Sequence, residues 1–156
     1  MKRFTDLIKE YASQVTELFP WDLSEALAEQ NNNTLIVDVR EPYEFSAMHI
    51  PGSINVPRGI LETACEYDYE ETVPELVQAR QRDVVVVCRS GNRSVLAAYA
   101  MQQLGYERVA SLKTGLRGWN DYEQPLVDAN SESVSVDDAE EYFTPRLRSE
   151  QQSASY

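Results

Sequence analysis

Residues 84–94 read VVVVCRSGNRS, and this stretch decides the fold. Four consecutive valines, Val84–Val87, predict a strand buried on both faces of a parallel sheet, because such strands are continuous β-branched runs. A short polar loop follows Cys88, and an alanine-rich helical pattern begins at Ser94. The stretch therefore predicts a strand, a tight turn and a helix N-terminus, with a thiol where the strand becomes the loop.

The position of Cys88 predicts a ligand site, since ligands of α/β sheets bind outside the carboxyl ends of the strands. The amides of the loop and of the helix start favour an anion, and Arg89 and Arg93 add positive charge. A cysteine in such surroundings is expected to be a thiolate more often than a free one, and hence a nucleophile. The alternative is an inert buried cysteine that ends a core strand.

Composition and charge narrow the possible partners. The chain has 156 residues, 42% of them hydrophobic, which suits one domain with extensions. Its net charge of −12 argues against non-specific binding to nucleic acid or to anionic membranes. Residues 121–141 hold eight acidic side chains and no basic one, whereas residues 84–118 hold five basic side chains and one acidic one. The surroundings of Cys88 are therefore locally positive, which suits a small anion.

The two cysteines, Cys65 and Cys88, form neither a disulfide framework nor a zinc site, so no metal and no cofactor are expected. The N-terminal sequence MKRFTDLIKEY has scattered charges and no apolar run, which does not fit a signal peptide. No stretch is long and apolar enough to span a membrane. We therefore expect a cytoplasmic protein.

Three parts follow from the pattern along the chain. Residues 1–20 are predicted as an N-terminal amphipathic helix, with its apolar stripe over 3–19 and its end at Pro20; it either docks on the domain or pairs with another subunit. Residues 21–127 alternate predicted helices and short strands in an α/β rhythm. Residues 128–156 form an acidic, serine-rich and partly mobile tail, and a part of it is expected to be anchored to the domain by Val134, Val136, Tyr142 and Phe143.

Residues 21–127 resemble the single-domain rhodanese sulfurtransferases. The matching segments, in the family's order, are LIVDVREPYEF (35–45), HIPGSINVP (49–57), the Cys88 segment, and LGYERVASLKTGLRGW (104–119). The resemblance implies a rhodanese-like α/β domain with a parallel five-stranded sheet flanked by helices, and Cys88 as its catalytic residue. Met48 and Thr114 stand where the family usually has glycine, which bears on the local backbone shape.

The resemblance also implies a sulfurtransferase reaction. Cys88 takes the sulfane sulfur of thiosulfate or of a persulfide donor, becomes a persulfide, and passes the sulfur to cyanide or to a thiol. The loop residues are expected to bind the donor and to stabilise the anionic sulfur; they are Arg89, Ser90, Gly91, Asn92, Arg93 and Ser94. Arg93 is the first choice for attracting the anionic group of the donor, ahead of Arg89.

The remaining candidate residues are expected to support the fold. Asp38 and Arg40 are expected to fix a strand end, and His49, the one histidine of the chain, to be a satisfied turn residue. Cys65 is expected to be incidental, since its acidic neighbours would raise the pKa of its thiol.

Three alternatives stay open at this point. A cysteine-dependent phosphatase or arsenate reductase uses the same fold, but the related phosphatases have a loop one residue longer than Cys88–Arg93. The second is a regulatory binding module without enzymatic activity, although such modules commonly lack the cysteine that this chain keeps. The third is a sulfur carrier whose two extensions dock a partner with a protein thiol. The sequence also leaves the oligomeric state open.

Overall fold

The valine run forms the centre of a five-stranded sheet in which every pairing is parallel. The computed structural model describes residues 1–154. The strands are β1 (Thr16–Leu18), β2 (Leu35–Asp38), β3 (Ile54–Asn55), β4 (Asp83–Val87) and β5 (Arg108–Leu112), in the order β1-β5-β4-β2-β3. The predicted fold class, a parallel five-stranded α/β sheet flanked by helices, is confirmed.

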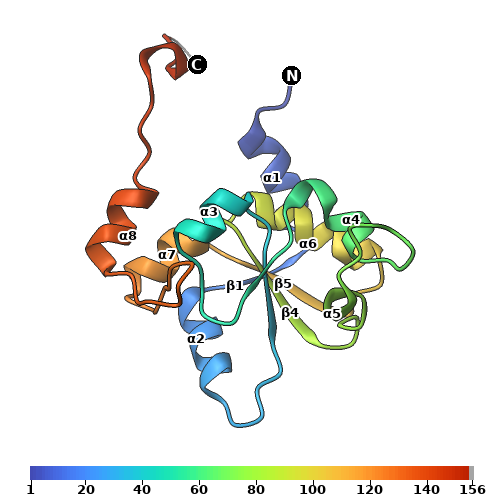
Figure 1. Cartoon of the computed structure of the whole chain (residues 1–156). Coiled ribbons are helices and arrows are strands. Elements are labelled where there is room, and N and C mark those ends of the chain that lie inside the picture. Colours follow the sequence, from blue (N-terminus) through green and yellow to red (C-terminus); the bar gives the residue numbers. More distant parts are fainter. Residues whose placement is uncertain (155–156) are drawn as a thin grey trace.

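Helices cover both faces of this sheet (Figure 1). They are α1 (Phe4–Ala12), α2 (Pro20–Ala28), α3 (Pro42–Ala47), α4 (Leu61–Ala64), α5 (Pro74–Val77), α6 (Arg93–Gln103), α7 (Gly115–Asp121) and α8 (Val136–Phe143), with 3-10 turns η1 (Arg58–Ile60) and η2 (Ser149–Gln151). Successive side chains of a strand point to opposite faces. Val84 and Val86 accordingly join the core that contains α4, α5 and α6, while Val85 and Val87 join the core that contains α2, α7 and α8.

The helix predicted over residues 3–19 is wrong in its second half. Helix α1 ends at Ala12, and residues 16–18 form the edge strand β1, which pairs with β5. Pro20 occupies the first turn of α2 instead of ending α1, a position where the missing N–H of proline has no cost. Helix α1 docks on the domain, with the Tyr11 and Tyr99 rings edge to face at 4.7 Å.

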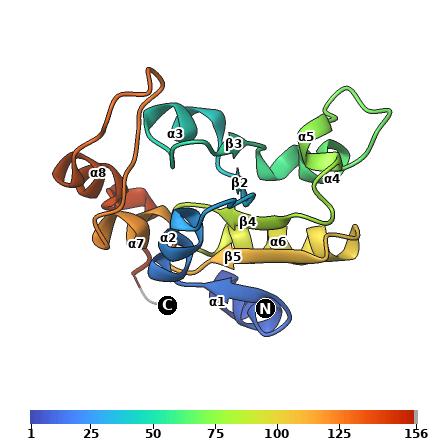
Figure 2. The same ribbon diagram turned by 90° about the horizontal axis from the view of Figure 1, so that it is seen from below.

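The acidic tail contains a helix that belongs to the core. Ala139 and Phe143 of α8 are fully buried among residues of α2 and α7, as the predicted anchoring by Phe143 requires. Val136 and Tyr142 remain 37% and 38% exposed. Figure 2 shows α8 beside α7, at the opposite end of the molecule from α4 and α5. The predicted mobility of the last residues stays a prediction, and residues 155–156 lie outside the described residues.

Within residues 1–154, none of the helices combines the length and the hydrophobicity needed to cross a lipid bilayer.

Candidate functional site

Cys88 follows β4 directly, and its sulfur lies inside the turn that leads into α6. The residue is only 1% exposed. The backbone N–H groups of Gly91 and Ser94 donate to Cys88 Sγ at 3.2 and 3.3 Å. Gly91 has a φ of +89°, and a Cβ at this position would lie 2.9 Å from the backbone nitrogen of Thr114. The loop therefore requires glycine here to close around the sulfur.

A chain of two buried hydroxyls continues from the sulfur to the neighbouring strand. Ser94 Oγ lies 3.3 Å from Cys88 Sγ and 2.7 Å from Ser111 Oγ on β5. Both serines are fully buried. When Ser111 donates to Ser94 Oγ, the Ser94 hydroxyl hydrogen is free to donate to an anionic sulfur. The site predicted from the sequence included Ser94 but missed Ser111. The one sequence feature that could have indicated Ser111 is that it places a hydroxyl within the otherwise apolar strand VASL.

The start of α7 fixes the other side of the loop. The N–H groups of Leu116 and Arg117 donate to the carbonyls of Cys88 and Arg89 at 2.9 and 3.0 Å. A Cβ on Gly115 would lie 2.5 Å from the Arg89 carbonyl carbon, so this close approach depends on glycine. Thr114 adopts a φ of +68°, the left-handed backbone that a glycine would adopt without strain. The turn therefore keeps a glycine-like shape in spite of its threonine.

Arg93, the expected first contact of the donor, is paired with a carboxylate of the protein. Its two terminal nitrogens donate to the two oxygens of Glu44 at 2.8 and 3.0 Å. Burial raises the pKa of Glu44, but the hydrogen bonds from Arg93 and from the Glu41 amide outweigh it and hold the pKa below its usual value. The Glu44 interaction raises the pKa of Arg93 in turn. Sequence reasoning missed Glu44, because it lies on α3, far from the loop along the chain.

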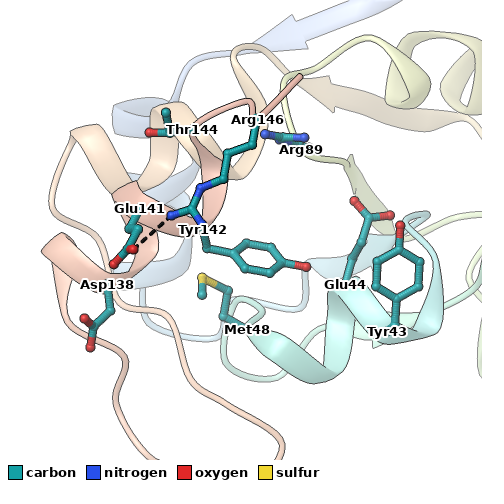
Figure 3. Close-up of a pocket in the computed structure, with 9 residues that line it drawn as sticks. All are labelled: Tyr43, Glu44, Met48, Arg89, Asp138, Glu141, Tyr142, Thr144 and Arg146. Atoms are coloured by element: carbon teal, nitrogen blue, oxygen red, sulfur yellow. Dashed lines mark hydrogen bonds and ion pairs between the residues drawn. The ribbon is translucent and has the colours of Figure 1, made fainter. Parts of the chain in front are cut away.

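Arg89 reaches in another direction, toward the C-terminal segment. Its Nη2 donates to the Phe143 carbonyl at 2.6 Å, at the end of α8. It also lines a pocket of about 570 Å³ between α3 and α8 (Figure 3). The other lining residues are Tyr43, Glu44, Met48, Asp138, Glu141, Tyr142, Thr144 and Arg146. Five of the nine lining residues come from the segment predicted as a tail, which the sequence did not associate with the site.

The other loop residues play less direct parts. Ser90 is exposed and Asn92 is half-buried at the start of α6. Because neither side chain hydrogen-bonds to Cys88 Sγ among residues 1–154, the loop holds the sulfur through its backbone and through Ser94.

Asp38 and Arg40 form a buried ion pair at the end of β2, with both side chains fully buried. Arg40 Nη2 donates to Asp38 Oδ2 at 2.8 Å and to the Met48 carbonyl at 2.7 Å. Arg40 Nη1 is buried and has no hydrogen-bond partner in the described part of the chain. These contacts join the end of β2 to the turn after α3, which fits the supporting role expected of Asp38 and Arg40.

His49 has a local partner, and Cys65 lies in the core. The His49 ring is stacked on Phe45, with its Nδ1 2.8 Å from the Phe45 carbonyl oxygen. Cys65 is fully buried, and burial, more than its acidic neighbours, raises the pKa of its thiol. Over residues 1–154, no three Cys, His, Asp or Glu side chains gather in a group that could hold a metal ion.

The comparisons with known proteins point to one family. Residues 22–122 match the model of the rhodanese-like domain. A sulfurtransferase of Allochromatium vinosum is 36% identical over 114 residues, which are 72% of this chain and 95% of that protein. A thiosulfate:glutathione sulfurtransferase of Saccharomyces cerevisiae is 29% identical over 103 residues, which are 63% of this chain and 73% of that protein.

A solved structure from Rhodopseudomonas palustris, described as that of a possible tyrosine phosphatase, has a similar fold. Its TM-score to this chain is 0.72 at 28% sequence identity, and the match covers 80% of this chain and 94% of that one.

Proposed function

This chain belongs to the rhodanese-like domain family, and we propose that it is a sulfurtransferase that carries sulfane sulfur on Cys88 as a persulfide. The arrangement of donors around Cys88 Sγ is the observation that carries the proposal. Two backbone N–H groups and the Ser94 hydroxyl lie within 3.3 Å of the sulfur. Such fixed donors stabilise negative charge in a buried site, whether it lies on a thiolate or on a persulfide.

In the first step, the Cys88 thiolate attacks the outer sulfur of thiosulfate. The new S–S bond forms as the S–S bond of thiosulfate breaks, and the electron pair of the broken bond leaves with sulfite. Cys88 becomes an anionic persulfide. The thiosulfate:glutathione sulfurtransferase relative supports this choice of donor. A persulfide donor reacts in the same way, with its thiolate as the leaving group.

In the second step, a thiophilic acceptor takes the outer sulfur. A thiol gives its proton to solvent and attacks as the thiolate, its new S–S bond forms, and the persulfide bond breaks to return the Cys88 thiolate. Cyanide accepts the same sulfur as thiocyanate. Because the enzyme alternates between two covalent states, we expect ping-pong kinetics. Free, buried cysteines suit a reducing compartment, and we propose the cytoplasm.

A phosphatase or arsenate reductase is the second candidate, favoured by the description of the Rhodopseudomonas structure. Two observations weigh against it. The loop from Cys88 to Arg93 has six residues, one fewer than in the related phosphatases, and leaves less room for the oxygens of a phosphate. In addition, the two terminal nitrogens of Arg93 are occupied by Glu44. Transfer of sulfur to a carrier protein would keep the chemistry of Cys88 and change only the acceptor.

The test is a pair of assays, one with thiosulfate and cyanide and one with p-nitrophenyl phosphate. We expect thiocyanate from the natural protein, none from Cys88→Ser, and no release of nitrophenol. Thiocyanate formation that survives Cys88→Ser would overturn the proposal. Nitrophenol release that depends on Cys88, without any thiocyanate, would favour the phosphatase.

A further inference from the structure

The pocket between α3 and α8 lies beside the Cys88 loop and has no role in the two steps above. Arg89, the residue after Cys88, lines it directly. Glu44, the partner of Arg93, lines it as well. The loop that surrounds the sulfur therefore borders the pocket at Arg89, and the partner of Arg93 at its other end borders it too, so a molecule bound there contacts the residue that follows Cys88.

The C-terminal segment supplies the outer wall of this pocket. We propose that Tyr142 and Arg146, together with Tyr43 of α3, bind the thiol acceptor, and that the pocket selects a small thiol carrying both carboxylate and ammonium groups. This inference rests on the proposed sulfurtransferase function and adds the residues that choose its acceptor.

Tyr142 offers a polar contact inside the pocket. Figure 3 shows its ring reaching from α8 toward Glu44, with the hydroxyl at the inner end. Burial raises the pKa of Tyr142, and the charges of Glu44, Arg40, Tyr43 and Arg89 act on the same hydroxyl. Within residues 1–154 this hydroxyl makes no hydrogen bond of its own, although it can both donate and accept one. A bound ligand is a suitable partner for it.

The charges around the pocket are of both signs. Arg146 pairs with Glu141 at 2.9 Å, and the two side chains are 74% and 70% exposed. Exposed pairs of this kind contribute little to stability, so Arg146 can exchange Glu141 for the carboxylate of a ligand. Glu141 and Asp138 are then available to an ammonium group. A molecule with several negative charges would meet these two carboxylates, which disfavours phosphorylated thiols.

The size of the pocket fits a small peptide better than thiosulfate. Its volume of about 570 Å³ lies within the range of roughly 300 to 1,000 Å³ that is usual for sites of small organic ligands. Thiosulfate has five heavy atoms and would leave most of this space empty. Glutathione, with two carboxylates, one ammonium group and a central thiol, has the required chemistry and is the probe for the test.

The first experiment measures binding without chemistry. S-Methylglutathione, which cannot accept sulfur, is titrated into the full chain, and its dissociation constant is measured by NMR. We expect Tyr142→Phe combined with Arg146→Gln to weaken binding about tenfold, because a charged and a neutral hydrogen bond are lost. Cys88→Ser should still bind. The matched controls Tyr67→Phe and Arg148→Gln change exposed side chains outside the pocket and should bind like the natural protein.

The second experiment measures selection of the acceptor during turnover. With thiosulfate as donor, the double variant should raise the KM for glutathione about tenfold and affect the KM for cyanide much less. Equal binding of S-methylglutathione by the natural protein and the double variant would overturn the inference, as would no binding by the natural protein. Failure to form a persulfide would instead overturn the proposed function, because the binding measurement does not depend on it.

Discussion

The guanidinium of Arg89 donates to the Phe143 carbonyl at 2.6 Å, and this bond ties the Cys88 loop to the C-terminal helix α8. The two residues are 54 positions apart in the chain. Phe143 is itself fully buried beside α7, whose first turn holds the carbonyls of Cys88 and Arg89. The C-terminal segment is thus part of the structure that shapes the site.

Replacing Arg89 should loosen α8. Arg89→Gln removes a charged hydrogen bond to the end of the helix, and we expect the free energy of unfolding in urea to fall by about 1 kcal/mol. Amide hydrogen exchange in α8 should become faster. Arg117→Gln, which changes an exposed arginine of α7, serves as the control. Unchanged exchange in α8 of the Arg89 variant would mean that the bond does not hold the helix.

Removing the Ser111 hydroxyl should slow the chemistry of Cys88. Ser111→Ala leaves Ser94 Oγ without its 2.7 Å partner, so the Ser94 hydroxyl is no longer oriented toward the sulfur. We expect persulfide formation from thiosulfate and alkylation by iodoacetamide to slow about tenfold. Ser53→Ala removes a hydroxyl that donates to the Ile50 carbonyl, outside the Cys88 loop, and provides the comparison. Equal rates in the two variants would rule out a role for the hydroxyl chain.

Stability should depend on the ionisation of Glu44. Burial is the largest single influence and raises its pKa, but the hydrogen bonds from Arg93 and from the Glu41 amide, together with the charges of Arg93 and Arg40, outweigh burial, so the folded-state pKa lies below the ordinary value of 4.5. Ionised Glu44 therefore adds stability above about pH 4.5, and this stability is lost as the pH falls through the folded-state pKa. Glu44→Gln should cost about 1–2 kcal/mol at neutral pH and should flatten the acid side of the stability profile.

The matched control for Glu44 is Glu141→Gln, which breaks an exposed pair with Arg146. Glu141→Gln should leave the stability at neutral pH and the acid side of the stability profile almost unchanged. An identical acid profile for Glu44→Gln and the natural protein would show that the Glu44 carboxylate does not contribute in this way.

Relieving the backbone at Thr114 should stabilise the protein. A β-branched residue with a φ of +68° is strained by on the order of 1–3 kcal/mol, and glycine adopts this conformation freely. After the larger chain entropy of unfolded glycine is subtracted, Thr114→Gly should gain about 1 kcal/mol and raise Tm by about 2–4 °C. Lys113→Gly, at a position without a positive φ, should lower Tm. A lower Tm for Thr114→Gly would contradict the assignment of strain.

Local patterns predicted the centre of the sheet and the Cys88 loop. Within eleven residues, the valine run predicts a buried strand and the small, polar loop predicts a tight turn. Strand β1 was predicted as part of a helix, because its three residues continue the apolar spacing of α1. Its partner β5 lies far along the chain, so no local pattern indicates the pairing. Pro20 can end one helix or begin the next, and only the packing of α2 decides between these.

The surroundings of Cys88 were less predictable than the loop itself. The partner of Arg93 is Glu44, 49 positions away, and the partner of Arg89 lies in a segment whose acidic, serine-rich composition indicated a tail. Contacts of this kind depend on tertiary packing, which brings α3 and α8 to the loop. Charge alone indicated that the arginines attract an anionic donor, which stays a prediction, but it gave no sign that each of them also has a partner within the protein.

The most direct measurement of the central claim is the intact mass of the protein after incubation with thiosulfate, beside a Cys88→Ser control. We predict a gain of one sulfur atom on the natural protein only, with loss of this atom and appearance of thiocyanate when cyanide is added. An unchanged mass after both thiosulfate and glutathione persulfide, or an equal gain on Cys88→Ser, would contradict the assignment of Cys88 as the sulfur carrier.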